Sequence, residues 1–446
     1  MFHGRTVPAF LATLVSLPAL LASPCAGQST GPAIFVVNNG SSGSSVTSFR
    51  VNADGTLTYA STVVPTAQLN PQTIDVSPNG RWLCVGHGSD AVSPDHLTFI
   101  EVHSDATMSI VLQTTTPDSP TCVRWLNDSL VVVTNTSATP NDMLMVYRFN
   151  SVTPSMEQVW FSSLSTTTFD IAIDRPHHLL YPRAATSSVW PMTWNDQTGV
   201  LTKLTPAPVP TGVFYLGPGV SPDGTKLYFG GGISTANGLS SRWIGGFNVD
   251  TSTGALTPMP NSPFLSPPQS GTSGPSPKQV VVSSNGQFAY VSHGTSGDVQ
   301  GFTINQSTGE LTAIPVGAYI DVGGQGNCSK MAVLNNRLYV MRYYSSPNDG
   351  VLAFNINGDG TLTRIGLPVY PTQGSLPWDI AVWRGVPCPA DIDGTGTVDV
   401  NDLLAVITGW GPCANPNNCP GDINGSGTID VNDLLAVITA WGQCPN

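Results

Sequence analysis

Charged residues are few in this chain: only 10% of its 446 residues are Asp, Glu, Lys or Arg, and Lys and Arg together number 16. Phosphate backbones are bound by clusters of Lys and Arg, so this composition and a formal net charge of −12 argue against a nucleic-acid partner. The chain also lacks a nucleophile elbow, a His-Glu-x-x-His zinc motif and a phosphate loop with a basic residue. Its hydrophobic content of 40% nevertheless predicts a sizeable core.

Long apolar runs are equally scarce. The run Val7–Leu21 follows Arg5 and is interrupted by Pro8 and Pro18, and no later segment is longer. A membrane span needs about 20 apolar residues, so we expect no membrane span. Small residues follow the run, which predicts a cleaved signal peptide at residues 1–27 and therefore a secreted, extracellular protein.

Marker residues recur along the chain with a period of 48. Five of them follow apolar runs at this spacing, and two more follow after steps of 62 and 49 residues, which makes seven units. The long step contains the Pro/Ser-rich segment Asn261–Ser276, which we interpret as a loop inserted between the fifth and sixth units. A period of this length, made of short strands and turns, predicts a β-propeller. The markers are Asn39, His87, Asn135, Arg183, Gly231, His293 and Arg342.

Two turn motifs punctuate these units. A Gly before a Leu-Thr pair recurs in five of them, as in Gly55–Thr58, and predicts a tight hairpin that enters the outer strand. A Ser-Pro-Asn-Gly turn or a close variant, such as Ser77–Gly80, follows the inner strand. The sequence thus predicts an all-β, seven-bladed propeller with four-stranded blades over residues 33–384.

The first unit lacks its inner strand. Residues 33–37 match the second strands of the other units, whereas Trp378–Val382 match their inner strands. Pairing of these two segments would build one blade from both ends of the propeller sequence. Such a blade closes the ring and hides the edges that an open sheet exposes.

The second strands, the Ser-Pro-Asp-Gly turns and the Asp-Gly-x-Leu-Thr hairpins resemble the seven-bladed lactonase-like propellers related to bacterial 6-phosphogluconolactonase, over residues 33–384. The resemblance implies this fold and, if activity is retained, a lactonase-type ester hydrolase, but the shared motifs form blades and identify no catalytic residue. The repeat register places six polar residues around one mouth of the central channel. There they could bind a carbohydrate or anionic sugar, or else satisfy backbone groups of adjoining loops. These ligand-binding candidates are Asn39, His87, Asn135, Arg183, His293 and Arg342.

Charged residues on the predicted inner strands form a second group. Strand alternation leaves open which of them face the channel, and structural salt bridges are the alternative to a functional role. Three cysteines, Cys84, Cys122 and Cys328, also lie in predicted strands, where we expect buried thiols because no basic cluster adjoins them. The charged group comprises Asp75, Arg124, Asp170, Lys278, Lys330 and Asp379.

Two nearly identical acidic segments end the chain, 31 residues apart. Calcium takes six to eight oxygen ligands, which a 12-residue loop offers at positions 1, 3, 5, 7, 9 and 12 around a glycine at position 6. Both segments comply, with Asp at position 12 where an EF-hand has Glu, and each runs into an apolar segment that predicts a short helix. We therefore expect a small α-helical domain that binds two Ca2+ ions. The predicted ligands are Asp391, Asp393, Thr395, Thr397, Asp399 and Asp402, then Asp422, Asn424, Ser426, Thr428, Asp430 and Asp433.

A calcium loop with only an exiting helix, duplicated and bracketed by cysteines, resembles the type I dockerin module and its GC-type subgroup. The resemblance covers residues 388–446, with the module at 391–446 after a linker at 385–390. It implies a module that folds on calcium and docks onto a cohesin-like receptor, attaching the protein to an extracellular assembly or a cell surface. The family's recognition positions, 10 and 11 of each loop, could instead merely begin the helix, with Val in the core. They are Val400, Asn401, Val431 and Asn432.

Cysteines bracket each copy of this repeat and predict disulfides formed in an oxidising compartment. Their positions suggest that Cys388 pairs with Cys413 and that Cys419 pairs with Cys444, each bond closing a loop around one site. Other pairings remain open at this point.

These features together predict a secreted, calcium-dependent anchoring module that carries a propeller for ligand or protein binding. The alternative is an exported sugar lactonase or related hydrolase of carbohydrate metabolism, anchored by the same module.

Overall fold

The computed structural model describes residues 31–443 apart from short gaps. The predicted signal peptide at residues 1–27 lies outside the described residues, as do Cys328, Cys388 and Cys444. None of the described helices is long and apolar enough to cross a membrane. The gaps are 41–43, 66–69, 89–94, 104, 118, 137–143, 163–167, 185–187, 205–208, 211–216, 236–237, 268–276, 295, 316–318, 322–329, 344–348, 386–389, 393–396, 414–418, 420 and 424–425.

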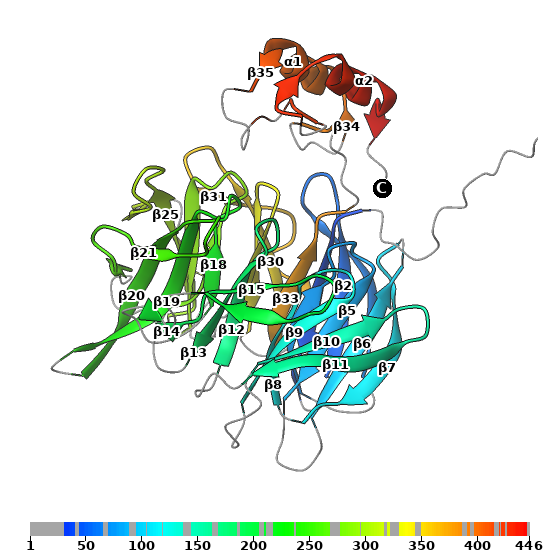
Figure 1. The fold of residues 1–446 in the computed structure, drawn as a ribbon, viewed down its shortest axis with the longest axis vertical. Helices are drawn as coiled ribbons and strands as arrows, with labels where there is room; N and C mark the ends of the chain where they lie inside the picture. Colours follow the sequence, from blue (N-terminus) through cyan, green and yellow to red (C-terminus); the bar gives the residue numbers. More distant parts are fainter. Residues whose placement is uncertain are drawn as a thin grey trace, which may run out of the picture.

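Seven antiparallel sheets follow one another along the chain, and they confirm the predicted propeller (Figure 1). Three blades have four unbroken strands. From the inside outwards, blade 1 contains β33 (Pro377–Trp383), β1 (Ala33–Asn38), β2 (Ser45–Val51) and β3 (Leu57–Val63). Blade 2 contains β4 (Pro71–Val76), β5 (Trp82–His87), β6 (His96–Val102) and β7 (Met108–Thr115). Blade 3 contains β8 (Ser119–Trp125), β9 (Leu130–Thr136), β10 (Leu144–Asn150) and β11 (Ser155–Ser162).

The other four blades have the same inner and second strands, but their outer part is broken into shorter strands. Blade 4 contains β12 (Thr168–Asp174), β13 (Leu179–Ala184), β14 (Ser188–Val189), β15 (Met192–Trp194), β16 (Leu201–Lys203) and β17 (Val209–Pro210). Blade 5 contains β18 (Pro218–Val220), β19 (Lys226–Thr235), β20 (Gly238–Val249), β21 (Leu256–Pro258) and β22 (Phe264–Leu265). Blade 6 contains β23 (Pro277–Val282), β24 (Phe288–His293), β25 (Asp298–Ile304), β26 (Leu311–Ala313) and β27 (Tyr319–Asp321). Blade 7 contains β28 (Met331–Leu334), β29 (Arg337–Arg342), β30 (Gly350–Ile356), β31 (Leu362–Arg364) and β32 (Tyr370–Pro371).

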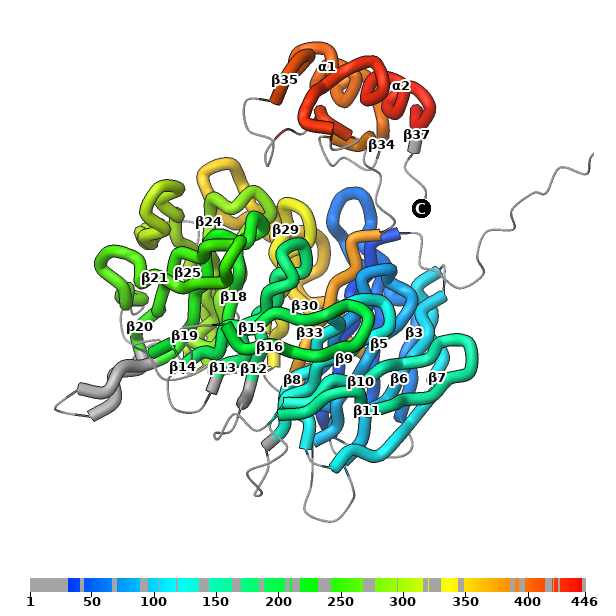
Figure 2. The backbone as a smooth tube through the Cα atoms, in the orientation of Figure 1, coloured from blue at the N-terminus to red at the C-terminus, as the bar shows by residue number. Residues whose placement is uncertain are grey.

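The ring closes through blade 1, as the sequence predicts. β33 pairs antiparallel with β1, with Val36 opposite Ile380, so the last strand of the propeller supplies the inner strand of the first blade. Figure 2 shows the orange β33 among the blue strands from the other end of the chain. Each inner strand packs on the next, including β28 on β33 and β33 on β4. The inner strands therefore form a closed ring around the channel.

The recurring hairpin glycines also hold neighbouring blades together. The backbone φ angles of Gly55, Gly309 and Gly360 are +83°, +80° and +80°, a region that favours glycine. Their carbonyls accept hydrogen bonds from the hydroxyls of Tyr339, Tyr228 and Tyr290, which belong to the second strands of the preceding blades. The Gly-x-Leu-Thr motif thus joins blades as well as turning the chain.

The segment Asn261–Ser276 is only partly the inserted loop that the sequence suggested. Its β22 pairs with β20, with Ile244 opposite Phe264, and so adds a strand to blade 5. Phe264 is buried against the core shared with blade 6, and this burial accounts for the strand. Residues 268–276 of the segment lie outside the described residues.

Residues 388–446, which we call the tail module, contain two nine-residue helices, α1 (Val400–Thr408) and α2 (Val431–Thr439). Four two-residue strands connect the repeats crosswise: β34 (Thr397–Val398) pairs with β37 (Gly442–Gln443), and β35 (Gly411–Pro412) pairs with β36 (Thr428–Ile429). The segment after each helix therefore pairs with the loop of the other repeat. Five buried side chains form the core, namely Ala390, Val398, Val406, Ile429 and Val437.

This crosswise pairing overturns the disulfide pairing suggested by the sequence. Cys413 bonds to Cys419, six residues further on, rather than to Cys388. The bond joins the end of the first repeat to the start of the second, over a sequence separation of six residues. Cys388 and Cys444 lie outside the described residues.

Digestion of the unreduced protein at the N-terminal side of Asp tests the pairing. Residues 402–421 then form one peptide that contains both Cys413 and Cys419. We expect this peptide to be released alone and to be lighter than its reduced form by two hydrogen atoms, as mass spectrometry would show. Recovery of the peptide only as a conjugate with peptides carrying Cys388 or Cys444 would contradict the structure.

Candidate functional site

The aspartate at position 12 of each loop is fully buried and organises its loop. Asp402 accepts hydrogen bonds from the backbone N–H of Ile392, at 2.6 Å, and of Asp399, at 2.8 Å. Asp433 accepts equivalent bonds from Ile423 and Asp430, both at 2.8 Å. Each carboxylate therefore ties position 2 and position 9 of its loop to the first turn of the helix.

The position-9 aspartates begin the helices. Asp399 and Asp430 are the N-caps of α1 and α2, and each accepts a hydrogen bond from the backbone two residues later, at 2.7 Å. Together with Asp402 and Asp433 they form reciprocal capping boxes, which satisfy backbone donors that a helix leaves unpaired. The loop and the helix are thus one structural unit, as the sequence predicted.

The second loop closes around its position-1 carboxylate. Asp422 accepts hydrogen bonds from the backbone N–H of Ser426, at 2.9 Å, and of Gly427, at 2.7 Å. Gly427, at position 6, has a φ of +84°, which supports the glycine requirement inferred from the sequence. Among the predicted ligands, Asp393, Thr395 and Asn424 lie outside the described residues, and the side chain of Thr397 is not described.

The charge of the tail module favours a bound cation. Seven aspartates follow Arg384, with no Lys, Arg or His among them. Burying carboxylates without a neighbouring positive charge is costly, so the module's own side chains cannot balance Asp402 and Asp433. The donors are all carboxylate, hydroxyl, amide and backbone oxygens, which is the ligand set of calcium. The residues present therefore fit two calcium ions.

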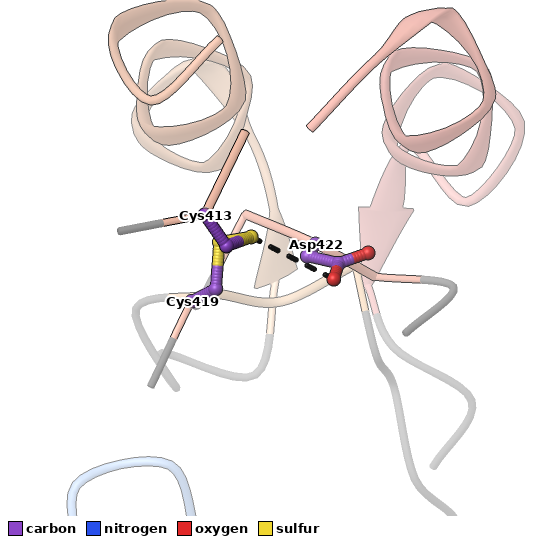
Figure 3. Close-up of side chains that lie close together, drawn as sticks. All are labelled: Cys413, Cys419 and Asp422. Atoms are coloured by element: carbon purple, nitrogen blue, oxygen red, sulfur yellow. Dashed lines mark hydrogen bonds between the residues drawn. A yellow bond between two sulfur atoms is a disulfide. The ribbon is translucent and has the colours of Figure 1, made fainter. Parts of the chain in front are cut away.

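Three further side chains in the tail module lie close enough together to hold a metal ion, but two of them form a disulfide. The sulfurs of Cys413 and Cys419 lie within 4.8 Å of an oxygen of Asp422 (Figure 3). Because the two sulfurs form a disulfide, they carry no thiolate that could bind a metal. The carboxylate of Asp422 thus remains available to the calcium loop.

Each helix exposes an apolar stripe. Val400 and Val431 are 55% and 54% exposed, so neither belongs to the core, which was the alternative to a recognition role. Asn401 and Asn432 beside them are exposed as well. Within each helix the stripe continues with residues three and four positions apart, which lie on one helix face, and a Trp two residues beyond the helix end extends it. All eight members are 49–55% exposed: Val400, Leu404, Ile407 and Trp410 in the first repeat, and Val431, Leu435, Ile438 and Trp441 in the second.

In the propeller, the six ligand-binding candidates lie near the ends of second strands, at equivalent places. Four of them, His87, Asn135, Arg183 and His293, are at most 2% exposed. His87 contacts the hydroxyl of Thr98, at 2.9 Å, on the neighbouring strand β6. Asn39 and Arg342 are partly buried. The repeat thus brings equivalent polar groups to one end of the sheets, where they are enclosed by the surrounding chain.

His293 belongs to an arrangement that the sequence did not reveal. One ring nitrogen, Nε2, lies 2.8 Å from the hydroxyl of Ser266, and the other, Nδ1, bonds to Asp298. A Ser-His-Asp order of this kind can activate a serine nucleophile. Here Ser266 is 0% exposed, so no substrate carbonyl can reach its hydroxyl. The arrangement therefore joins blade 6 to the segment after β22.

The inner strands hold a charged cluster inside the ring. Asp170 of blade 4 bonds to Lys330, which precedes β28 of blade 7, at 2.9 Å, and to Arg124 of blade 3 at 3.2 Å. Since blades 4 and 7 are not neighbours, the bond to Lys330 crosses the channel. Burial alone would raise the pKa of Asp170, but the charges of Lys330 and Arg124 overcome it and lower the pKa to about 2.

At Asp379 the effect of burial on the pKa outweighs the attraction of the neighbouring cations, which is the reverse of the situation at Asp170. It accepts hydrogen bonds from the backbone N–H of Ile74, at 3.1 Å, and of Ile380, at 3.0 Å. Burial raises the pKa of Asp379, and the attraction of Lys330 and Arg124 only partly offsets this effect. The channel therefore holds one firmly ionised carboxylate and one that protonates more readily.

The remaining inner-strand residues differ in their roles. Asp75 forms a salt bridge with Arg175 at 2.9 Å and accepts a hydrogen bond from the backbone N–H of Trp125 at 2.8 Å. It therefore has a structural role in joining blades. Lys278 is half-buried, and burial lowers the pKa of its amine. Cys84 and Cys122 are buried free thiols, as expected, and burial raises the pKa of both. Neither thiol has the thiolate character that nucleophilic chemistry needs.

The fold and these sites together define a seven-bladed β-propeller followed by a small module of two helices. No family model and no curated protein matches the chain. Solved structures do match. A putative 6-phosphogluconolactonase from Bacteroides fragilis is 15% identical, over 79% of this chain and 98% of that one, with a TM-score of 0.64. The periplasmic gluconolactonase of Pseudomonas aeruginosa is 17% identical, over 80% and 99%, with a TM-score of 0.63.

A second Bacteroides structure, a putative 6-phosphogluconolactonase from Bacteroides uniformis, is 14% identical over 79% of this chain and 99% of that one, with a TM-score of 0.62. The structural neighbours of the propeller are thus 6-phosphogluconolactonase-like seven-bladed propellers. At this level of identity the likeness shows the fold alone.

Proposed function

We propose that this chain is a secreted anchoring protein, in which a dockerin-like tail module binds two calcium ions and docks the propeller onto a cohesin-like receptor. The observation that carries the proposal is the doubled unit of loop and helix, in which a buried aspartate closes each acidic loop and the adjoining helix exposes an apolar stripe. Calcium would be held by the oxygens of the two loops. The protein would be attached to an extracellular assembly or a cell surface in this way.

The two stripes define the kind of receptor that fits. Each stripe carries the same four apolar side chains and the same exposed asparagine at position 11 of its loop. A receptor should therefore present an apolar face with polar partners for one asparagine at its rim. Because the repeats are equivalent, the receptor could engage either stripe, and binding should survive the loss of one of them.

Charge substitutions at the stripes test this proposal. We expect Val400→Asp alone and Val431→Asp alone to weaken binding by no more than about threefold, whereas the double variant should lose it by at least about 100-fold, since a buried charge without a partner is costly. Surface plasmon resonance with a panel of purified cohesin modules, in calcium and in chelator, measures the affinities. Thr408→Asp with Thr439→Asp adds the same charge next to the stripes and serves as a control.

Binding that persists in the double variant would contradict the docking surface. Binding by no cohesin in calcium would instead contradict the receptor class.

For the propeller, we infer a binding role toward a carbohydrate, an anionic sugar or a protein. One observation favours the alternative of a sugar lactonase: Asp379, whose pKa is raised, shares the channel with the cations Lys330 and Arg124. Attack of water on a lactone needs a base and positive groups to stabilise the oxyanion, and this cluster contains both types of group. The fold similarity to proteins described as lactonases agrees with this reading.

A lactonase assay distinguishes the two roles. Hydrolysis of gluconolactone-type substrates that falls when Asp379 becomes Asn, or when His87, His293, Arg183 or Arg342 becomes Ala, would support the enzyme. Circular dichroism must show that each variant is folded, because these side chains are buried. Failure across a broad panel of lactones would leave the binding role.

A further inference from the structure

The disulfide of the tail module is attached to the second calcium loop by backbone hydrogen bonds on both sides. The N–H of Cys413 donates to the carbonyl of Gly427, at 3.0 Å, which is position 6 of that loop. The carbonyl of Cys419 accepts the N–H of Asp422, at 2.9 Å, which is position 1. The bond between the two sulfurs therefore fixes the distance between the groups that support the two ends of the tight turn.

The side chains add a direct contact. The Sγ atom of Cys413 lies 3.7 Å from Oδ2 of Asp422, the same oxygen that accepts the N–H of Gly427 (Figure 3). Both cysteines are half-buried against the core of the module. The disulfide thus limits the movement of the position-1 carboxylate, which is the first predicted ligand of the loop.

Within the part of the chain that the structure describes, the contacts of Cys413 and Cys419 with the calcium loops go to the second loop. Among the described residues, no hydrogen bond joins Cys413 or Cys419 to a residue between 391 and 402. The influence of the bond on the two predicted calcium sites should therefore be unequal.

We propose that Cys413 and Cys419 are positioning residues of the second calcium loop, and that their disulfide gives this loop a higher calcium affinity than the reduced chain has. The inference rests on the proposed calcium-binding function. Reduction by a dithiol transfers two electrons and two protons to the disulfide, yields two thiols and oxidises the dithiol to its own disulfide. The segment that holds Asp422 and Gly427 then loses its fixed spacing, so the second site, and with it receptor docking, becomes sensitive to thiol reductants.

Loop-resolved calcium titration of the full chain tests this proposal. The amide signals of Ile392 and Ile423, which occupy position 2 of the two loops, report each site separately by NMR. In the variant with Cys413→Ser and Cys419→Ser, we expect the affinity at Ile423 to fall by about 10–100-fold, as is usual when the support of a metal ligand is removed. The affinity at Ile392 should change by less than about twofold. Reduction and reoxidation of the wild-type chain should lower and restore the affinity at Ile423, which covers the case in which the variant fails to fold.

The outcomes separate this inference from the function on which it rests. Unchanged affinity at Ile423, or an equal fall at both loops, would overturn the positioning role while leaving calcium binding intact. Absence of calcium binding at both loops of the wild-type chain would overturn the proposed function and this inference together.

Discussion

Chelation of calcium is expected to unfold the tail module and to leave the propeller folded. The module's seven aspartates have no cationic side chain among them, and the buried Asp402 and Asp433 would lose their counter-charge. Among the residues of the module that the structure describes, five apolar side chains are buried in its core, and a domain of about 60 residues with a small core is only marginally stable. Calcium at about 100 times its dissociation constant contributes about 2.7 kcal/mol per site. Metal binding should therefore be coupled to folding of the module.

Calorimetry of the full chain with and without chelator measures this effect. We expect two transitions in calcium and only the propeller transition in chelator. The double variant with Asp391→Ala and Asp422→Ala should behave in calcium as the wild type does in chelator. Glu157→Ala removes an exposed carboxylate on the edge strand β11 and should change neither transition. A single transition that chelation does not move would contradict the prediction.

Loss of the carboxylate at Asp170 is expected to be the most damaging single change in the propeller channel. Asp170→Asn removes the carboxylate that pairs with the partly buried Lys330 and Arg124 and leaves the more readily protonated Asp379 to face both cations. Removal of one partner from a buried ion pair costs about 3–5 kcal/mol. We expect the propeller transition to fall by about 5 °C or more. Glu157→Gln, the same chemical change at an exposed site, should have no measurable effect.

The pH dependence of this variant provides an independent check. The pKa of Asp170 is about 2 in the folded chain, below the value of about 3.9 for an unfolded aspartate. A lowered pKa contributes stability that is fully present above about pH 4 and is lost as the pH falls through 2. The difference in melting temperature between wild type and Asp170→Asn should therefore shrink between pH 4 and pH 2. A difference that stays constant over this range would show that the charge of Asp170 is not its cause.

Much of the fold could be predicted because its signals repeat. Hairpin glycines such as Gly55 and Gly360 recur in five of the seven units, and their positive φ angles explain the preference for glycine at this turn. Ala106 takes the equivalent place in blade 2, with a φ of +63°. Residues 33–37 match the second strands of the other units and Trp378–Val382 match their inner strands, and this register predicted the closing blade that the pairing of β1 with β33 forms. The outer strands of blades 4–7 were less predictable, because they are short and some depend on burial of single residues such as Phe264.

The candidate sites differ in the same way: features that depend on local spacing were predictable, and features that depend on tertiary contacts were not. The loop chemistry of Asp422 and Gly427 is local, and it was readable from spacing alone. The disulfide was predicted wrongly, because the spacing of the four cysteines permits several pairings, and Cys413 bonds to Cys419, six residues further on. The Ser266 contact to His293 had no sequence signal, since 27 residues and a blade boundary separate the two side chains.

By itself, the sequence determined the number of blades, the closure of the ring and the composition of the two acidic loops, because each of these follows from short-range patterns that repeat. Only the tertiary structure decided which charged side chains meet inside the ring, which cysteines bond, and which half of each helix is left exposed. Lys330 and Asp170 are 160 residues apart and become partners only when seven sheets surround one channel. Contacts of that kind depend on the relative placement of whole elements, and no local spacing encodes them.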